Sequence, residues 1–274
     1  MWNRRIAIRH LVERFPRLAR LYRGIRDLID NSSLAPVTPW GFTLAGHAAM
    51  ASGDFEPDET RLVRCLLKEV DIFVNIGANV GYYCCHALSM GKAVIAVEPI
   101  PRNVHYLLRN IRENGWSRRA EVYPVALGTQ VDILNIWGGG TAASLIKGWA
   151  GIQESYVTQV PVLTLERVLG SALENRKALI LLDVEGAEYE ILQGSLKTLN
   201  LNPRPIWFVE IMASEHLPQG IDFNPNFVSI FEFFYKNSYT AMTADKYQKP
   251  VSLDQVIAFV NGQKPIEAHN FIFR

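Results

Sequence analysis

The sequence predicts an α/β fold with a mostly parallel, seven-stranded sheet and helices on both of its faces. Short apolar runs of four to seven residues recur along the chain, and helical patterns separate most of them. Such runs are typical of strands that are buried on both faces of a parallel sheet. The 274 residues are 49% hydrophobic and 20% charged, which is the composition of a globular protein that needs no disulfide bonds.

Residues 1–39 are predicted to form a basic amphipathic helical arm and a linker, in front of one domain at 40–274. Residues 1–30 hold eight arginines against three acidic residues, and apolar residues recur among them at helical spacing. We expect the arm to pack on the body or on a second subunit, as in a homodimer, or to make peripheral contact with an anionic membrane. The remaining residues are slightly acidic, which disfavours nucleic acid as a partner.

The first half of the domain alternates helices and strands. A helix is predicted from Pro57, because Asp58 and Glu59 stand in its first turn and an apolar stripe follows. The next predicted elements, in chain order, are a strand at 71–76, a helix at 82–90, a strand at 93–97, a helix at 102–114 and a strand at 121–126.

The second half contains an insertion and then resumes the alternation. Two strands, at 131–137 and 156–163, flank a glycine-rich segment and predict a β-hairpin inserted after the third strand, over about 128–163. We expect this flap to cover a substrate, because a parallel sheet binds ligands at the carboxyl ends of its strands. The remaining predicted elements are strands at 179–182, 205–211, 239–242 and 271–273 and helices at 187–199 and 226–237.

A glycine-rich turn follows the first strand. It runs from Gly77 to Gly81 and opens a helix, which is the setting that a nucleotide-binding loop requires. Gly77 allows a sharp turn, and Gly81 allows close packing of the helix. Glu98 lies 17 residues beyond Gly81, near the end of the second strand, where its carboxylate can accept both hydroxyls of an adenosine ribose.

The turn favours S-adenosylmethionine (SAM) over a cofactor that carries phosphates. A dinucleotide site prefers G-x-G-x-x-G, so that the pyrophosphate reaches the helix N-terminus. Here Asn79 stands where that site prefers glycine, and the chain has no Gly-Lys-Ser/Thr loop for a nucleotide triphosphate. SAM has no phosphates.

Acidic residues end the fourth and fifth strands. Asp183 and Glu210 take these places, and Glu185 and Glu188 come just after Asp183. Acids gathered around one cleft raise one another's pKa values, which suits a general base. We name Asp183, Glu185, Glu210 and, in the loop after the fifth strand, His216 as candidate catalytic residues. No metal site is predicted, because no ligand spacing singles one out.

From about residue 40 onward the chain resembles the FkbM-type family of SAM-dependent methyltransferases. The resemblance implies a Rossmann-like class I methyltransferase fold, SAM as cofactor and O-methylation of a small metabolite, a sugar or a polyketide-type compound. The segments that carry it are Asn75–Tyr82, Ala96–Pro99 with Asn103, Val125–Leu127, Thr164-Leu165, Asp183–Glu188, Val209–Ile211 and Asn270–Ile272. The candidate cofactor-binding residues are Asn75, Gly77, Ala78, Asn79, Gly81, Tyr82, Glu98, Pro99, Asn103, Ala126 and Asp183.

Two departures from the family pattern keep other functions open. The family usually has Asp where Asn75 stands, and often Lys where Leu181 stands. A catalytically weakened SAM-binding module is therefore one alternative, and a dinucleotide-dependent oxidoreductase is another. The favoured function is methyl transfer from SAM to a hydroxyl, or less readily to a carboxyl, of a small molecule or glycan. The three cysteines suit a reducing compartment, so we expect a cytoplasmic, or membrane-associated, enzyme.

Overall fold

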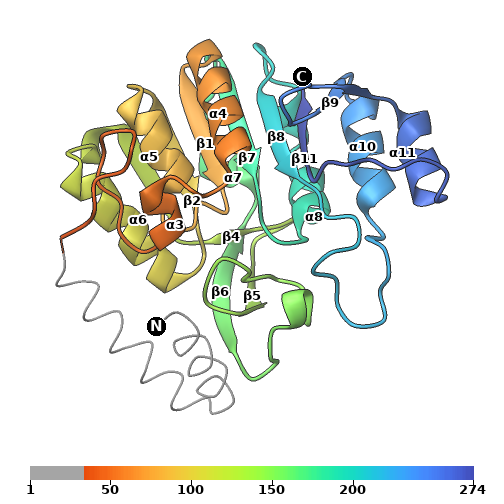
Figure 1. The fold of residues 1–274 in the computed structure, drawn as a ribbon, viewed down its shortest axis with the longest axis horizontal. Coiled ribbons are helices and arrows are strands. Elements are labelled where there is room, and N and C mark those ends of the chain that lie inside the picture. Colours follow the sequence, from red (N-terminus) through yellow and green to blue (C-terminus); the bar gives the residue numbers. More distant parts are fainter. Residues whose placement is uncertain (1–33) are drawn as a thin grey trace.

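The computed structural model describes residues 34–274 (Figure 1). Most of the predicted arm, up to residue 33, therefore lies outside the described residues. The described chain has a large sheet with helices on both faces and a smaller, separate sheet beside it.

The large sheet contains the seven predicted strands and one more. Its order is β10-β9-β11-β8-β7-β1-β2-β3. The five strands from β8 to β3 are parallel, and the three at the other end pair antiparallel. The eighth strand, β10, has only two residues, too few to give a recognisable apolar run. The strands are β1 (Ile72–Ile76), β2 (Ala93–Val97), β3 (Ala120–Tyr123), β7 (Ala178–Leu182), β8 (Ile206–Glu210), β9 (Ala241–Thr243), β10 (Pro250–Val251) and β11 (Asn270–Phe273).

Helices cover both faces of this sheet, as the sequence predicts, and each face has its own buried apolar cluster. One face packs against α3 (Ala48–Ser52), α4 (Pro57–Leu66) with the short η1 (Leu67–Glu69), α5 (Tyr82–Ser89) and α6 (Pro101–Glu113). The other packs against α7 (Leu165–Leu169), α8 (Glu188–Gln193), α9 (Leu196–Leu199), α10 (Phe227–Lys236) and α11 (Leu253–Val260). A single turn, η2 (Ser117–Arg119), precedes β3.

The predicted insertion forms a hairpin. Its strands, β5 (Asp132–Trp137) and β6 (Val157–Leu163), pair antiparallel, and the connection between them contains the short η3 (Trp149–Gly151). The insertion also takes a third strand, β4 (Ala126–Leu127), which pairs parallel with β6. In Figure 1 this small sheet lies apart from the large one, at the bottom of the view.

Two predicted elements end earlier than the sequence suggested. The strand predicted at 121–126 stops at Tyr123, and the residues after Pro124 join the small sheet instead, because proline has no N–H for the ladder. The helix predicted at 187–199 is two short helices, α8 and α9, separated at Gly194 and Ser195. Gly194 lies against the backbone: a Cβ there would be 2.7 Å from the carbonyl oxygen of Gly128.

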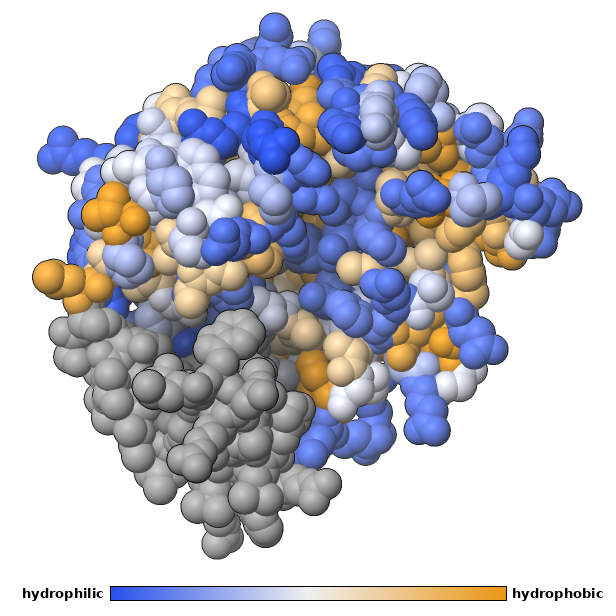
Figure 2. All heavy atoms as spheres, in the orientation of Figure 1, coloured by the Kyte–Doolittle hydropathy of each residue, from blue (hydrophilic) through white to orange (hydrophobic). Residues whose placement is uncertain are grey.

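The surface seen in Figure 2 is mainly hydrophilic, and its hydrophobic residues form small, separate patches. Among the described residues, the structure has no helix with both the length and the apolar character needed to cross a membrane.

Candidate functional site

A cavity opens at the carboxyl ends of β1, β2 and β7, and Gly77, Glu98 and Asp183 are in its lining. The neighbours of β1 are β2 on one side and β7 on the other. In the chain, however, the connection from β1 runs only to β2. The strand order therefore reverses between β1 and β7. Ligands of α/β sheets bind at such a reversal. Eight predicted site residues line the cavity: Gly77, Asn79, Glu98, Pro99, Asn103, Ala126, Asp183 and Glu185.

The turn after β1 forms one wall of the cavity and depends on Gly77. The sheet register pairs Ile76 with Leu182, so that Gly77 and Asp183 lie side by side just beyond their strands. Gly77 has φ +84°, and a Cβ there would stand 1.7 Å from the carbonyl oxygen of Asp183. A side chain at this position is therefore excluded twice, by the backbone conformation and by the neighbouring chain.

Glu98, at the end of β2, faces this turn. Its Oε2 accepts a hydrogen bond from the Asn79 N–H at 2.8 Å. Its Oε1 accepts from the Ile100 N–H at 2.9 Å and from Asn103 Nδ2 at 3.2 Å. Burial raises the pKa of Glu98 to about 7, although the three donors oppose that rise. Since Oε2 has one donor and two lone pairs, it can accept a further hydrogen bond from a ligand in the cavity.

Four candidate cofactor-binding residues do not line the cavity. Gly81, at φ +88°, lets the start of α5 pack against Leu107 of α6. Ala78 and Tyr82 are buried, and the Tyr82 hydroxyl pairs with Thr60 Oγ1. Asn75 is also buried; its Nδ2 donates to Cys84 Sγ at 3.4 Å, while its Oδ1 has no hydrogen-bond partner within the described residues. These four residues therefore support the turn without lining the cavity.

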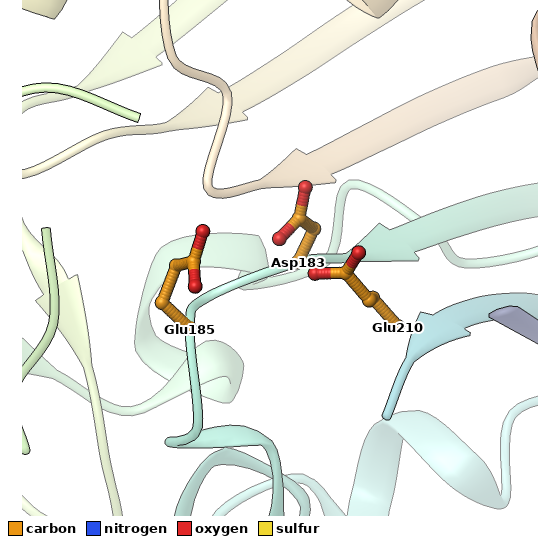
Figure 3. A group of neighbouring side chains, drawn as sticks. All are labelled: Asp183, Glu185 and Glu210. Atoms are coloured by element: carbon orange, nitrogen blue, oxygen red, sulfur yellow. The ribbon is translucent and has the colours of Figure 1, made fainter. Parts of the chain in front are cut away.

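Three predicted catalytic acids lie close together (Figure 3), and two of them, Asp183 and Glu185, line the cavity. Asp183 follows β7, Glu185 lies two residues further along, and Glu210 is the last residue of β8. One carboxylate oxygen of each lies within 4.8 Å of the others. In Figure 3 Asp183 stands between Glu185 and Glu210. The parallel pairing of β7 with β8 thus brings together acids that are 27 residues apart in the sequence.

Asp183 and Glu210 share a proton. The pKa of Glu210 is raised to about 11, mainly by burial and then by the neighbouring Asp183 charge. Burial also raises the pKa of Asp183, but the hydrogen bond from Glu210 opposes that rise. At neutral pH, Glu210 therefore keeps its proton and donates it to the Asp183 carboxylate.

Glu185 is held in a strained conformation. Its φ is +58°, a value that residues other than glycine rarely adopt and that tends to occur at functional sites. Burial and the Asp183 charge raise the pKa of Glu185. His216 lies beside it: the distance from His216 Nδ1 to Glu185 Oε2 is 3.6 Å. All four candidate catalytic residues are therefore neighbours.

The structure adds residues that the sequence did not single out. Trp149 Nε1, from the insertion, donates to Glu185 Oε2 at 2.6 Å. Apolar residues of the insertion, Ile136 and Leu145, line the same cavity as Glu98. Glu56 has a pKa raised to about 7, mainly by burial, and lies near enough to Asp183 for that charge to contribute. These contacts join distant segments, and the sequence alone carries no local signal for them.

Raised carboxyl pKa values predict a protein that loses stability as pH rises. Burial is the main cause of the pKa values of about 7 at Glu56 and Glu98 and about 8 at Glu188. The unfolded chain releases these protons near pH 4.5, so between pH 6.5 and 8.5 the folded ligand-free protein binds more protons than the unfolded chain. His47 and His86, whose pKa values burial lowers, bind protons mainly in the unfolded chain; this opposes the trend close to pH 6.5 and vanishes as the pH rises above about 7.5.

We therefore expect the thermal unfolding midpoint to fall between pH 6.5 and 8.5. Glu188→Gln removes one of these groups and should flatten the decline, whereas Glu190→Gln, at an exposed position on the same helix, should leave it unchanged. A midpoint that rises over this range would contradict the assignment of buried, protonated carboxyls.

Comparisons with known proteins give one family match. A family model described as the methyltransferase FkbM domain matches residues 75–240. A search of curated proteins finds no match. Among solved structures, a methyltransferase FkbM from Methylobacillus flagellatus is similar, with 14% identity and a TM-score of 0.44 over 74% of this chain and 43% of that one. A precorrin-6y C5,15-methyltransferase from Geobacter metallireducens has 11% identity and a TM-score of 0.42 over 88% and 97% of the two chains.

Proposed function

Because the chain belongs to the FkbM methyltransferase domain family, we propose that it is a SAM-dependent O-methyltransferase acting on a hydroxyl of a small metabolite, sugar or glycan. The observation that supports this best is the make-up of its cavity. A buried carboxyl suited to a ribose, Glu98, lines the same cavity as Asp183 and Glu185. A nucleoside site and a group of proton acceptors are thus within reach of one bound cofactor.

The cavity suits SAM better than a cofactor with phosphates. Its lining, taken from the described residues, contains three carboxyls and no lysine, arginine or histidine. A pyrophosphate would meet negative charge there with no cation to offset it. SAM carries a positive sulfonium and a positive ammonium group, which the carboxyls attract. This argues against the dinucleotide-dependent alternative.

The chain's own residues must bind, orient and deprotonate the acceptor. Bound SAM supplies an electrophilic methyl group. An alcohol does not ionise near neutral pH, so a positioned base has to take its proton. Glu185 is suited to this: Oε2 accepts from Trp149, whereas Oε1 makes no hydrogen bond within the described chain. We assign Glu185 Oε1 as the proton acceptor, and His216 as the group that stabilises the Glu185 charge between turnovers.

The Asp183 carboxylate, hydrogen-bonded to protonated Glu210, is proposed to orient the acceptor. It lies beside the turn at Gly77 and beside Glu185, and therefore between the nucleoside end of the cavity and the base. A carboxylate there attracts the positive part of the cofactor and can accept a hydrogen bond from a hydroxyl. An acceptor that is itself a carboxylate would be repelled, which favours a hydroxyl acceptor.

Glu98→Ala should weaken SAM binding at least tenfold. The substitution removes a charge-assisted hydrogen bond from a ribose hydroxyl to Oε2, worth about 1.5–3 kcal/mol. Calorimetric titration with SAM measures the effect, and Glu174→Ala, at an exposed position outside the cavity lining, serves as the control. Because Glu98 also anchors three donors of the protein, the unfolding midpoint of each variant must be measured too. An affinity equal to that of the wild type would refute the ribose assignment.

The proposed reaction is tested with methyl-labelled SAM and a panel of acceptors that bear hydroxyl or carboxyl groups. Transfer of label to a hydroxyl, with one S-adenosylhomocysteine released per methyl, is expected. A chelator added in parallel tests metal assistance, since the three acids lie close enough together to share a cation. SAM binding without transfer to any acceptor would favour the alternative of a SAM-binding module, to which Asn75 and Leu181 point.

A further inference from the structure

The insertion contacts the acid cluster through Trp149. The indole Nε1 donates to Glu185 Oε2 at 2.6 Å, and the side chain is 2% exposed. A buried, short hydrogen bond from an indole to a carboxylate is directional, and it fixes one of the two carboxylate oxygens.

Neighbouring contacts hold this indole in place. A Cβ at Gly186, the residue after Glu185, would stand 2.6 Å from Trp149 Cζ3, so only glycine leaves room for the ring. Ser144 Oγ donates to the carbonyl oxygen of Glu185 at 2.6 Å, and the Ala150 N–H donates to that of His216 at 2.6 Å. The segment around Trp149 is thus bonded to the loop after β7 and to the loop after β8.

Glu185 needs such support. Its backbone, at φ +58°, lies in a region that disfavours side chains, and its own side chain is only 15% exposed. Repulsion from the Asp183 carboxylate pushes the Glu185 carboxylate away from the cluster. Of the two groups that contact Glu185 Oε2, the indole N–H is the closer, at 2.6 Å, since His216 Nδ1 is 3.6 Å away.

We infer that Trp149 is a positioning residue, whose indole N–H holds Glu185 Oε2 so that Oε1 is presented to the acceptor hydroxyl. The inference rests on the proposed function, in which Glu185 is the base. The same insertion lines the cavity with Ile136 and Leu145, so the segment that encloses the cofactor also orients the base. The hydrogen bond lowers the pKa of Glu185 against the effect of burial, so removal of the indole N–H should raise it.

The test compares Trp149→Phe with Trp137→Phe. The first keeps an aromatic ring but removes the N–H; the second removes an indole of the same insertion that has no side-chain hydrogen bond among the described residues. The indole N–H signals of the six tryptophans are recorded by ¹⁵N–¹H NMR, and the signal of Trp149 is identified as the one lost in Trp149→Phe. We expect this signal to lie downfield in the wild type and to move in Glu185→Gln, whereas the Trp137 signal stays in place.

The second measurement is kinetic, with an acceptor that the labelled-methyl assay identifies. Trp149→Phe should lower kcat about tenfold and shift the acid limb of its pH profile upward, with SAM affinity within twofold of the wild type. The inference would be overturned if the Trp149 indole N–H signal kept its position in Glu185→Gln. It would also be overturned if the kcat of Trp149→Phe equalled that of Trp137→Phe. A wild-type protein that binds no SAM would instead refute the proposed function, so the two failures are distinguishable.

Discussion

Gly77→Ala is expected to abolish SAM binding and to lower the free energy of unfolding by about 4 kcal/mol or more. The new Cβ would stand 1.7 Å from the carbonyl oxygen of Asp183, closer than any van der Waals contact allows. Because that oxygen belongs to backbone at the end of a buried strand, the turn and not the strand must move. Moving the turn displaces Asn79, whose N–H donates to Glu98 Oε2. Calorimetry with SAM and thermal unfolding measure the two effects.

Gly115→Ala is the matched control for this substitution. Gly115 has a similar φ of +75°, but a Cβ there would meet nothing within 4 Å. It should therefore show only the conformational cost of a side chain in the left-handed region, about 1–2 kcal/mol, and leave SAM affinity unchanged. If Gly77→Ala behaved like Gly115→Ala in both measurements, Gly77 would not lie as close to the Asp183 carbonyl oxygen as the structure places it.

Glu185→Gln should lower turnover by about 10²-fold or more, the usual contribution of a general base. The amide keeps the shape of the side chain but cannot accept the acceptor's proton at neutral pH. SAM affinity should change little, because the ribose contact is at Glu98. Glu210→Gln should cost much less, since Glu210 already holds a proton and an amide N–H can replace its donation to Asp183.

Comparison of the turnover of Glu185→Gln with that of Glu210→Gln identifies which acid is the base. Glu190→Gln, at an exposed position in α8, controls for loss of charge near the site. Equal activity of Glu185→Gln and the wild type on the same acceptor would exclude Glu185 as the base. A larger loss in Glu210→Gln than in Glu185→Gln would move the base to the Asp183–Glu210 pair.

Much of this fold is predictable because its signals are local. The parallel strands other than β3 are largely apolar runs of a few residues, and the turn from Gly77 to Gly81 directly follows the first of them. The acids Asp183 and Glu210 are predictable for the same reason, since each stands at the end of such a run and parallel strands end at one edge. The β5–β6 hairpin is likewise predictable, from two strand-like segments and the glycine-rich stretch between them.

The parts that escaped prediction depend on contacts between distant segments or on very short elements. The hydrogen bond from Trp149 to Glu185 spans 36 residues, and neither sequence neighbourhood indicates it. Asn75 resembles a cofactor contact by motif, yet its side chain turns towards Cys84. Helix α11 is an exception: Ser252 and Gln255 form a capping box, a local signal of a helix start from which the helix could have been predicted.

Binding of SAM in this cavity is measured by parallel calorimetric titrations of the wild-type protein with SAM and with NAD⁺. We expect saturable binding of SAM to one site per chain and no binding of NAD⁺, because the described cavity lining presents carboxyls and no cation to a pyrophosphate. Binding of NAD⁺ with no binding of SAM would contradict it.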